Sequence, residues 1–308
     1  MTGLVAPAAL RAQLQGRAAR GGPDGATWLR ALPALAQRRL AAWELAPDGT
    51  PLAGSSSLVL PVRTAAGEAA ALKLAWPHPE NEHEHLALRI WAGRGAVRLR
   101  RAEPAERALL LERARPQDLS GLPVLEACRV VGELLRTLSR PPRPPFPRLS
   151  DTARQWQREL EEAAWLDGRF PRRFRLQAIS ALRRFSGDEL DLVLVHQDLH
   201  YGNVLAADRT PWLAIDPQPL LGTPEFAMAP ALWNRVDEAG HGGALAAALE
   251  ERIEAMALAA DADEDRARAW ALVRFTVNAK WEVEEPTGAP HNDISRLVQL
   301  CKAVQKGT

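Results

Sequence analysis

The chain has 308 residues, of which 46% are hydrophobic and 25% charged, and its formal net charge is +1. These values are ordinary for globular proteins and exclude a wholly disordered, collagenous or coiled-coil chain, and the length suits one bilobal unit or two modest domains. No stretch approaches the roughly 18 apolar residues of a membrane span. Two cysteines, Cys128 and Cys301, are too few for a disulfide framework. We therefore expect a folded cytoplasmic protein with no membrane partner.

Charge is distributed unevenly along the chain. Residues 1–115 carry 16 Lys and Arg against 10 Asp and Glu, whereas residues 237–300 carry 6 against 13. A basic front part suits phosphate binding, but its positive charges form no dense run, which argues against nucleic acid as a partner. Solvated surface faces would explain the same asymmetry equally well.

The front of the chain has the pattern of a small sheet with helices. An apolar helical stripe runs from Trp28 to Trp43, and Pro33 indicates a helix start near that residue. After the turn signal at 47–49, three runs have strand character and the segment between the second and third is helical. The strand-like runs are 56–63, 68–76 and 107–113, and the helical segment is 79–93. This pattern predicts an antiparallel sheet that carries a helix.

From residue 122 onward the apolar spacing becomes mostly helical. The predicted helices are 122–138, 151–167, 172–186, 224–238, 241–260, 262–283 and 291–304. The proline-rich segment 139–150 is expected to be a loop, because proline lacks an amide donor. We expect an α+β chain with an N-terminal nucleotide-binding domain at 1–115 and a helical catalytic and acceptor-binding domain at 116–308.

One strand-rich interruption within the helical part carries polar residues at its strand ends. Asp198 and Asn203 have the spacing D-x-x-x-x-N between the runs 191–195 and 204–207, and Asp216 ends the next strand. In phosphoryl transfer this spacing supplies an Asp that accepts the hydroxyl proton, while the Asn and a later Asp hold Mg²⁺. The spacing alone occurs by chance in many chains, but its strand context makes it specific. The sequence therefore predicts a kinase with Asp198 as base and with Asn203 and Asp216 as metal ligands.

Lys73 lies in the middle of an apolar strand, where a cation is normally excluded. Lysine otherwise occurs only at 280, 302 and 306, so the chain uses Arg as its general surface cation. The kinase template needs a strand lysine that reaches nucleotide phosphates and is oriented by a helix glutamate. We expect Glu84 to be that partner, with Glu80 and Glu82 as alternatives. A solvated helix face would explain any one of these glutamates without a role in binding.

Two further segments complete the expected ATP site. The loop 47–57 would cover the phosphates with the amides and hydroxyls of Gly54, Ser55 and Ser56. It matches no strict glycine-rich signature, and alone it also fits a flexible hairpin, so the lysine downstream is what favours a binding role. The backbone from Glu112 to Ala114 would pair with adenine.

The segment 195–235, VHQDLHYGNVLAADRTPWLAIDPQPLLGTPEFAMAPALWNR, resembles the aminoglycoside phosphotransferases, most of all the branch of streptomycin 6-kinases and hydroxyurea kinases. ALKLAWPHPE, ALRIWAGRGAVRLRRA and ALLLER resemble the same branch. The resemblance implies a bilobal protein-kinase-like fold and transfer of the γ-phosphate of ATP, with Mg²⁺, to a hydroxyl of a small acceptor, either an aminoglycoside or a hydroxyurea-like molecule. It assigns the base to Asp198, the metal to Asn203 and Asp216, the phosphate contact to Lys73, and a loop-shaping role to His196. We expect a monomer or weak dimer.

Two departures from the family pattern bear on activity. Gln197 stands where the family commonly has Gly, which places a side chain at a tight backbone position. Ala227 and Thr223 stand where acidic residues usually anchor the catalytic loop, and Glu225 is a candidate replacement. These departures motivate an alternative function, a catalytically weak pseudokinase that binds nucleotide as a regulator.

Another alternative is a metallohydrolase that binds Zn²⁺ or Mn²⁺ through His196, Asp198 and His200. It lacks an H-E-x-x-H motif and leaves Asn203 and Lys73 unexplained.

The acidic back part of the chain bears on the acceptor. Glu282, Glu284 and Glu285 follow Trp281, and their carboxylates would attract an amino-bearing substrate. A polar helix end explains the same residues equally well.

Overall fold

The computed structural model describes residues 5–19, 21–141, 143, 145–185, 190–285 and 293–305. Contacts divide the chain into two compact units. Unit 1 is the chain up to Pro116 together with Ala206–Gln218, and unit 2 is Gln117–Leu205 together with the chain from Pro219 onward. The expected domain plan placed 206–218 in the second domain, whereas the contacts of this segment group it with unit 1.

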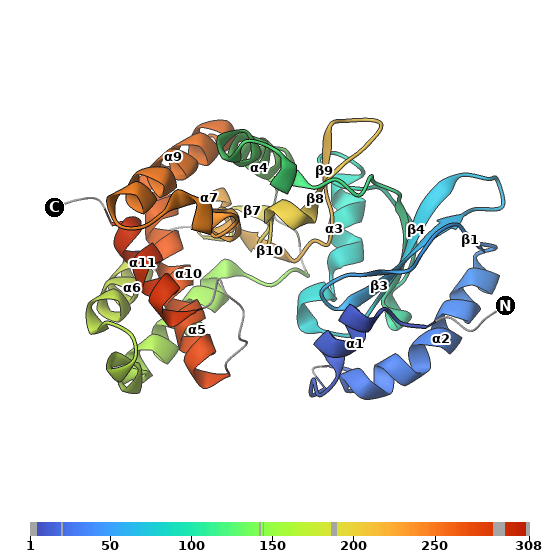
Figure 1. Ribbon diagram of the computed structural model, residues 1–308, viewed down its shortest axis with the longest axis horizontal. Helices are drawn as coiled ribbons and strands as arrows, with labels where there is room; N and C mark the ends of the chain where they lie inside the picture. The colour runs from blue at the N-terminus through green and yellow to red at the C-terminus, as the bar shows by residue number, and fades with distance from the viewer. Residues whose placement is uncertain are drawn as a thin grey trace. The chain divides into compact units, whose positions relative to one another are not determined.

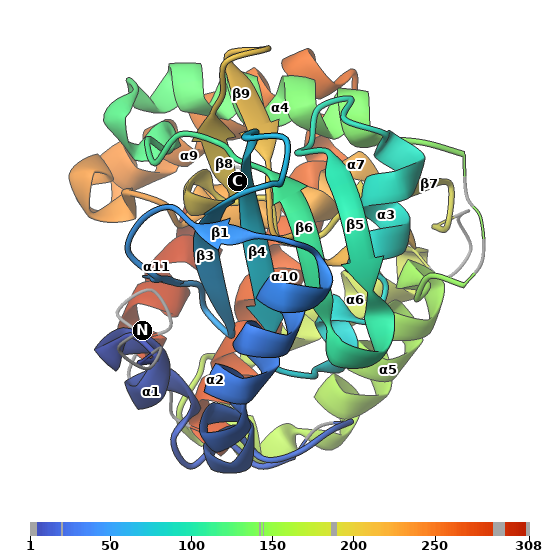
Figure 2. The same ribbon diagram turned by 90° about the vertical axis from the view of Figure 1, so that its right-hand side faces the viewer.

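Unit 1 is built on an antiparallel sheet with the strand order β1-β3-β4-β6-β5, and β2 also pairs with β3 (Figure 2). The strands are β1 (Ala46–Pro47), β2 (Leu52–Ala53), β3 (Ser57–Arg63), β4 (Ala69–Ala75), β5 (Leu99–Glu103) and β6 (Ala108–Glu112). The strands β3, β4 and β6 were predicted. Strand β5, with the sequence LRRAE, was missed because it has no apolar alternation and lies at a sheet edge.

The helices of unit 1 are α1 (Ala8–Leu14), α2 (Gly25–Ala42) and α3 (Glu84–Trp91), with 3₁₀ turns η1 (Pro79–Asn81) and η2 (Pro104–Glu106). The expected helix start near Pro33 is wrong. Helix α2 begins after Asp24, whose carboxylate accepts a hydrogen bond from Thr27 N at 2.7 Å, and Pro33 lies inside the helix. An interior proline costs a backbone hydrogen bond, which the buried apolar stripe of the helix offsets. The helix expected at 79–93 begins only at Glu84, because η1 precedes it.

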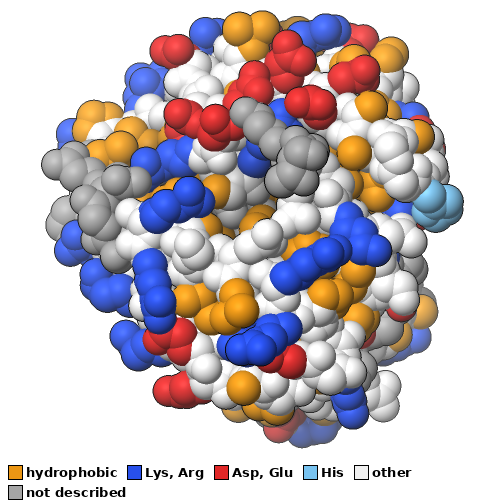
Figure 3. Space-filling view, turned by 90° about the vertical axis from the view of Figure 1, so that its left-hand side faces the viewer, with side chains coloured by type: hydrophobic (Ala, Val, Ile, Leu, Met, Phe, Trp, Pro, Cys, Tyr) orange, Lys and Arg blue, Asp and Glu red, His pale blue; other side chains and the backbone are white. Residues whose placement is uncertain are grey.

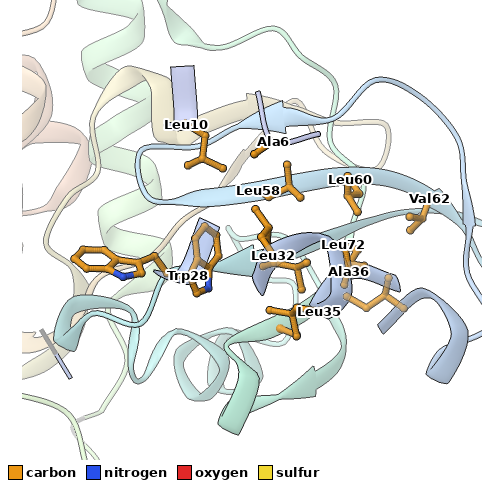
Figure 4. Packing of buried hydrophobic residues seen from close by; sticks show 14 of the residues in the cluster. Ala6, Leu10, Trp28, Leu32, Leu35, Ala36, Leu58, Leu60, Val62 and Leu72 are labelled. Carbon is orange, nitrogen blue, oxygen red and sulfur yellow. The ribbon is translucent and has the colours of Figure 1, made fainter. Parts of the chain in front are cut away.

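The alternation of side chains in the sheet decides where Lys73 points. Leu72 and Leu74 of β4 belong to the apolar cluster that covers one face of the sheet (Figure 4). Helix α2 contributes its stripe to this cluster, through Trp28, Leu32, Leu35 and Ala36. Helices α2 and α3 lie on opposite faces (Figures 1 and 2). Because successive side chains of a strand point to opposite faces, Lys73 faces α3.

Unit 2 is mainly helical, and no helix among the described residues is long and apolar enough to cross a membrane. Its α-helices are α4 (Val124–Leu138), α5 (Leu149–Glu162), α6 (Arg172–Phe185), α7 (Pro224–Ala227), α8 (Ala229–Leu232), α9 (Gly243–Ala260), α10 (Glu264–Glu284) and α11 (Ile294–Ala303). Its 3₁₀ turns are η3 (Leu119–Gly121), η4 (Ala164–Gly168), η5 (Tyr201–Asn203) and η6 (Val236–Ala239). The helix expected at 224–238 is interrupted twice. Pro230 lies in the first turn of the separate helix α8, and Arg235 adopts a left-handed φ of 49°.

Short strands frame the polar segment that the sequence singled out. Strand β7 (Val193–His196) pairs antiparallel with β10 (Pro219–Gly222), and β8 (Val204–Ala206) pairs with β9 (Trp212–Ala214). The polar residues 197–203 form the loop and the turn η5 between β7 and β8. The proline-rich segment contains no helix before Leu149 in its described part, as expected, while Pro142 and Pro144 lie outside the described residues.

Candidate active site

A buried ionic cluster in unit 1 contains Lys73. Its Nζ donates to the two carboxylate oxygens of Glu84 at 2.7 and 2.6 Å, and to Asp216 Oδ1. The side chains of Lys73 and Glu84 are only 6% and 3% exposed. The alternative partners lie elsewhere, since Glu80 pairs with His78 and Glu82 with Arg107. Lys73 therefore pairs with the expected glutamate.

Electrostatics keep Lys73 charged. Burial alone would lower the pKa of its ammonium, but the carboxylates of Asp216 and Glu84 outweigh burial and raise this pKa. Burial raises the pKa of Glu84 to about 7, against the opposing effect of Lys73. Lys73 thus keeps its positive charge on the face of the sheet that α3 covers.

The backbone around β9 explains how Asp216 reaches Lys73. Ala214 N donates to Gly95 O at 2.8 Å and Val97 N donates to Ala214 O at 3.0 Å, which ties the end of β9 to the segment after α3. Two residues later Asp216 has a φ of 54°, a left-handed conformation that non-glycine residues seldom adopt. Unusual backbone conformations of this kind are concentrated at functional sites.

The loop that carries Asp198 lies in unit 2 and is closed by its own side chains. The buried His196 accepts a hydrogen bond from Asp198 N on its Nδ1 at 3.2 Å. The Nδ2 of Asn203 donates to Asp198 O at 2.9 Å and lies 3.4 Å from Asp198 Oδ2. His200 Nε2 lies 3.9 Å from the same carboxylate oxygen. Asp198 and Asn203 are therefore joined directly, within one short turn.

The chemistry of these side chains fits a hard cation. Because the amide nitrogen of Asn203 is bonded to Asp198, its amide oxygen is the atom that can bind a metal. In unit 1, Asp216 offers carboxylate oxygens, which Mg²⁺ also prefers as ligands. Metal binding by either residue stays a prediction. Within the described residues, no group of three or more His, Cys, Asp or Glu side chains is arranged to hold a metal ion. The metallohydrolase alternative therefore finds no support in that part of the chain.

The structure also bears on the departures from the family pattern. Gln197 is not among the described residues with a positive φ, so this position does not require the left-handed conformation that favours glycine. Ala227 is fully buried, and the buried hydroxyl of Thr223 makes no hydrogen bond with any described residue. The carboxylate of Glu225 accepts from Asp263 N at 3.3 Å, before α10, so the expectation that Glu225 anchors the catalytic loop is wrong.

The expected phosphate loop is the turn between β2 and β3, which contains Gly54, Ser55 and Ser56. Gly54 N donates to Ser57 O at 2.8 Å, and a Cβ on Gly54 would overlap the hydroxyl of Ser57, which explains the glycine. Phosphate binding by this turn stays a prediction.

In the expected adenine segment, Glu112 is already engaged within unit 1. Its N donates to Arg98 O at 2.8 Å, and its carboxylate accepts from Arg98 N and Arg209 Nε at 2.9 and 2.7 Å. Glu112 N is thus already paired, and the adenine contact stays a prediction for the rest of the backbone from Glu112 to Ala114.

Sequence reasoning missed two residues that shape these segments. Within unit 1, Arg209 ties the β8–β9 turn to Glu112 and to Ala96 O, the latter at 2.8 Å. Asn234 Oδ1 accepts from Tyr201 N at 2.9 Å, inside the catalytic loop. An arginine in a turn has the pattern of a surface residue, so Arg209 gave no signal. The signal for Asn234 was its place near the end of the family-like segment 195–235.

Comparisons with known proteins agree with the geometry. A family model for the aminoglycoside/hydroxyurea antibiotic resistance kinases matches residues 42–286. A streptomycin 6-kinase of Streptomyces griseus is 38% identical over 277 residues, which cover 86% of this chain and 87% of the relative. A hydroxyurea phosphotransferase of Kitasatospora aureofaciens is 39% identical over 271 residues, which cover 86% of this chain and 77% of the relative.

Solved structures share the fold. A thermostable mutant of the aminoglycoside phosphotransferase APH(4)-Ia, in a ternary complex with ADP and hygromycin B, has a TM-score of 0.58 at 15% identity and covers 87% of this chain and 96% of its own. The choline kinase LicA from Streptococcus pneumoniae also has a TM-score of 0.58, at 12% identity. The match covers 89% of this chain and 99% of the LicA chain. These likenesses confirm the expected protein-kinase-like fold. The family match and the relatives confirm a small-molecule kinase, and the chain belongs to the aminoglycoside/hydroxyurea antibiotic resistance kinase family.

Proposed function

We propose that this chain transfers the γ-phosphate of ATP, with Mg²⁺, to a hydroxyl of a small amino-bearing acceptor of the aminoglycoside class. The observation that carries the proposal is the buried cluster of Lys73, Glu84 and Asp216. Burying ionised groups is costly, and a fold retains such a cluster when the charges serve binding or chemistry. A hydroxyurea-like acceptor is the second candidate, because one relative is a hydroxyurea phosphotransferase.

Each residue has a definite task in this proposal. The Lys73 ammonium binds phosphate oxygens of ATP, and Glu84 fixes its direction. Asn203 and Asp216 would hold Mg²⁺, which neutralises phosphate charge when it is bound. The bond from Asn203 Nδ2 to Asp198 O fixes the loop that carries the base.

Asp198 acts on the acceptor. Its carboxylate accepts the proton of the acceptor hydroxyl as that oxygen forms a bond to the γ-phosphorus. The bond between the γ-phosphorus and the bridging oxygen breaks, and ADP leaves with the electron pair. All residues that this chemistry needs are present, and no observation on the described residues favours the pseudokinase alternative.

The test is a turnover screen with purified protein, MgATP and a panel of aminoglycosides, hydroxyurea and amino alcohols. We expect ADP release with one acceptor class and a gain of one phosphoryl group on that acceptor by mass spectrometry. Asp198→Asn is the control for contaminating kinases. Nucleotide binding without turnover on every acceptor would favour a regulator, and stoichiometric zinc in the purified protein would favour a hydrolase.

A further inference from the structure

The catalytic loop carries the proposed base and a proposed metal ligand, whose positions must be fixed to within a fraction of an ångström for efficient transfer. Glu225, the candidate anchor, is bonded to Asp263 N instead. Other contacts therefore hold the loop.

Tyr201 ties the loop to other segments of unit 2. Its backbone N donates to Asn234 Oδ1 at 2.9 Å. Its ring is fully buried, and its hydroxyl lies 3.3 Å from Cys128 Sγ and donates to Val124 O at 3.4 Å. Both of these partners belong to α4. The residue is therefore held on its backbone by one segment and on its ring by another.

The segment that presents Asn234 is itself fixed by a buried arginine. Arg252 of α9 is 2% exposed. Its Nη1 donates to Leu232 O at 3.2 Å and to Asn234 O at 2.7 Å, and its Nη2 donates to Arg235 O at 3.2 Å. A guanidinium offers several donors in a rigid plane, which suits it to gather successive carbonyls of a turn.

We propose that Asn234, held in place by Arg252, is a positioning residue of the catalytic loop. The inference rests on the proposed function, since it concerns the loop that carries Asp198. Tyr201 lies between Asp198 and Asn203 in the chain, so a bond to its backbone restrains the base and the metal ligand together.

The test separates the acceptor oxygen of Asn234 from its bulk. Asn234→Leu keeps the size and removes the acceptor, whereas Asn234→Asp keeps an oxygen at that position. Asn278→Leu, the same substitution elsewhere in unit 2, is the matched control. Tyr201→Phe removes the hydroxyl contacts but keeps the backbone donor. For each variant we would measure kcat, KM for ATP, and the hydrogen exchange rate of the Tyr201 amide.

We expect Asn234→Leu to lower kcat about 10- to 100-fold, with KM for ATP within about twofold and with faster exchange at Tyr201. Asn234→Asp should retain most of the kcat and the slow exchange, and Asn278→Leu should resemble the wild type. Equal losses in the Leu and Asp variants, or unchanged exchange in Asn234→Leu, would overturn the proposal. If the wild-type protein phosphorylates no acceptor, the proposed function fails, but the exchange measurement still decides whether Asn234 anchors the loop.

Discussion

The two units hold their functional side chains by different kinds of interaction. In unit 1, Lys73 is fixed by the opposite charges of Glu84 and Asp216. In unit 2, the loop of Asp198 is fixed by neutral hydrogen bonds that end on backbone groups, such as the one from Tyr201 N to Asn234. Opposite charges thus hold the Lys73 ammonium, which is proposed to bind phosphate. Neutral hydrogen bonds hold the loop of Asp198, so the Asp198 carboxylate remains the main charge of that loop. The comparison predicts that substitutions in the two units fail in different ways.

The largest effect is expected at the base. Asp198→Asn keeps the size of the side chain and removes proton acceptance, so turnover should fall by roughly 10² to 10⁴. The affinity for MgATP should change little, because the proposed nucleotide contacts come from other residues. Turnover is measured by ADP release and affinity by titration calorimetry. Turnover close to that of the wild type would remove Asp198 from the mechanism.

A smaller loss is expected when the charge of the unit 1 cluster is kept but its shape is changed. In Lys73→Arg a planar guanidinium replaces a compact ammonium between two carboxylates. The loss of one well-placed charged hydrogen bond, about 1.5–3 kcal/mol, corresponds to roughly 10- to 100-fold in kcat/KM for ATP.

Lys280→Arg is the matched control, since Lys280 is also a buried lysine paired with carboxylates, Glu159 and Glu284. We expect this variant to keep its activity. Full activity in Lys73→Arg would show that the buried cluster is structural.

The contrast between charged and neutral interactions also explains which site residues could be predicted from the sequence. Lys73 was visible because a lone lysine in an apolar strand is out of place, and Glu84 followed from the helix next to it. The bond from Asn234 to a backbone amide leaves no trace in composition or spacing, because any polar residue in a turn looks alike. The same limit applies to the strands. The sequences of β3 and β4 are apolar or alternate between apolar and polar residues, so both strands were predicted. The charged edge strand β5 is defined only by its pairing with β6.

The packing beneath the loop of unit 2 gives a third prediction. Gly132 lets α4 approach α9, because a Cβ on it would overlap Met256 O and lie 2.7 Å from the Cβ of Ala259. Both helices support the loop, since α4 carries Cys128 and α9 carries Arg252. Replacing a glycine inside a helix by alanine normally stabilises the protein. Here the added methyl group would overpack the contact between α4 and α9, so the substitution should destabilise the protein.

We expect Gly132→Ala to lower the free energy of unfolding by about 1–3 kcal/mol, measured by urea denaturation. Gly243→Ala, at the start of α9, is the control, since a Cβ there meets no atom within 4 Å. That variant should be neutral or stabilised by less than about 1 kcal/mol. Equal stability of the two variants would mean that α4 and α9 do not need close contact at Gly132.

The smallest effect is expected at the acidic end of α10. Neutralising Glu282, Glu284 and Glu285 together should raise KM for a cationic acceptor and flatten its dependence on salt, because long-range attraction is lost. The expected change is modest, since exposed charges contribute about 0–1 kcal/mol each and Glu284 is already paired with Lys280 at 2.8 Å. On the face of the molecule in Figure 3, most acidic side chains gather near the top, and Lys and Arg are scattered among hydrophobic and uncharged surface.

The experiment must separate the effect of where the charges are removed from the effect of how many charges are removed. The matched control therefore neutralises three other acidic residues of the same stretch, Glu251, Glu254 and Asp261. KM for the acceptor found in the turnover screen is measured at low and high salt. A rise of about two- to fivefold at low salt in the first triple variant alone would place the acceptor near the end of α10. Equal behaviour of both triple variants, or a neutral acceptor, would rule out an acidic acceptor site there and leave the polar helix end as the explanation of these residues.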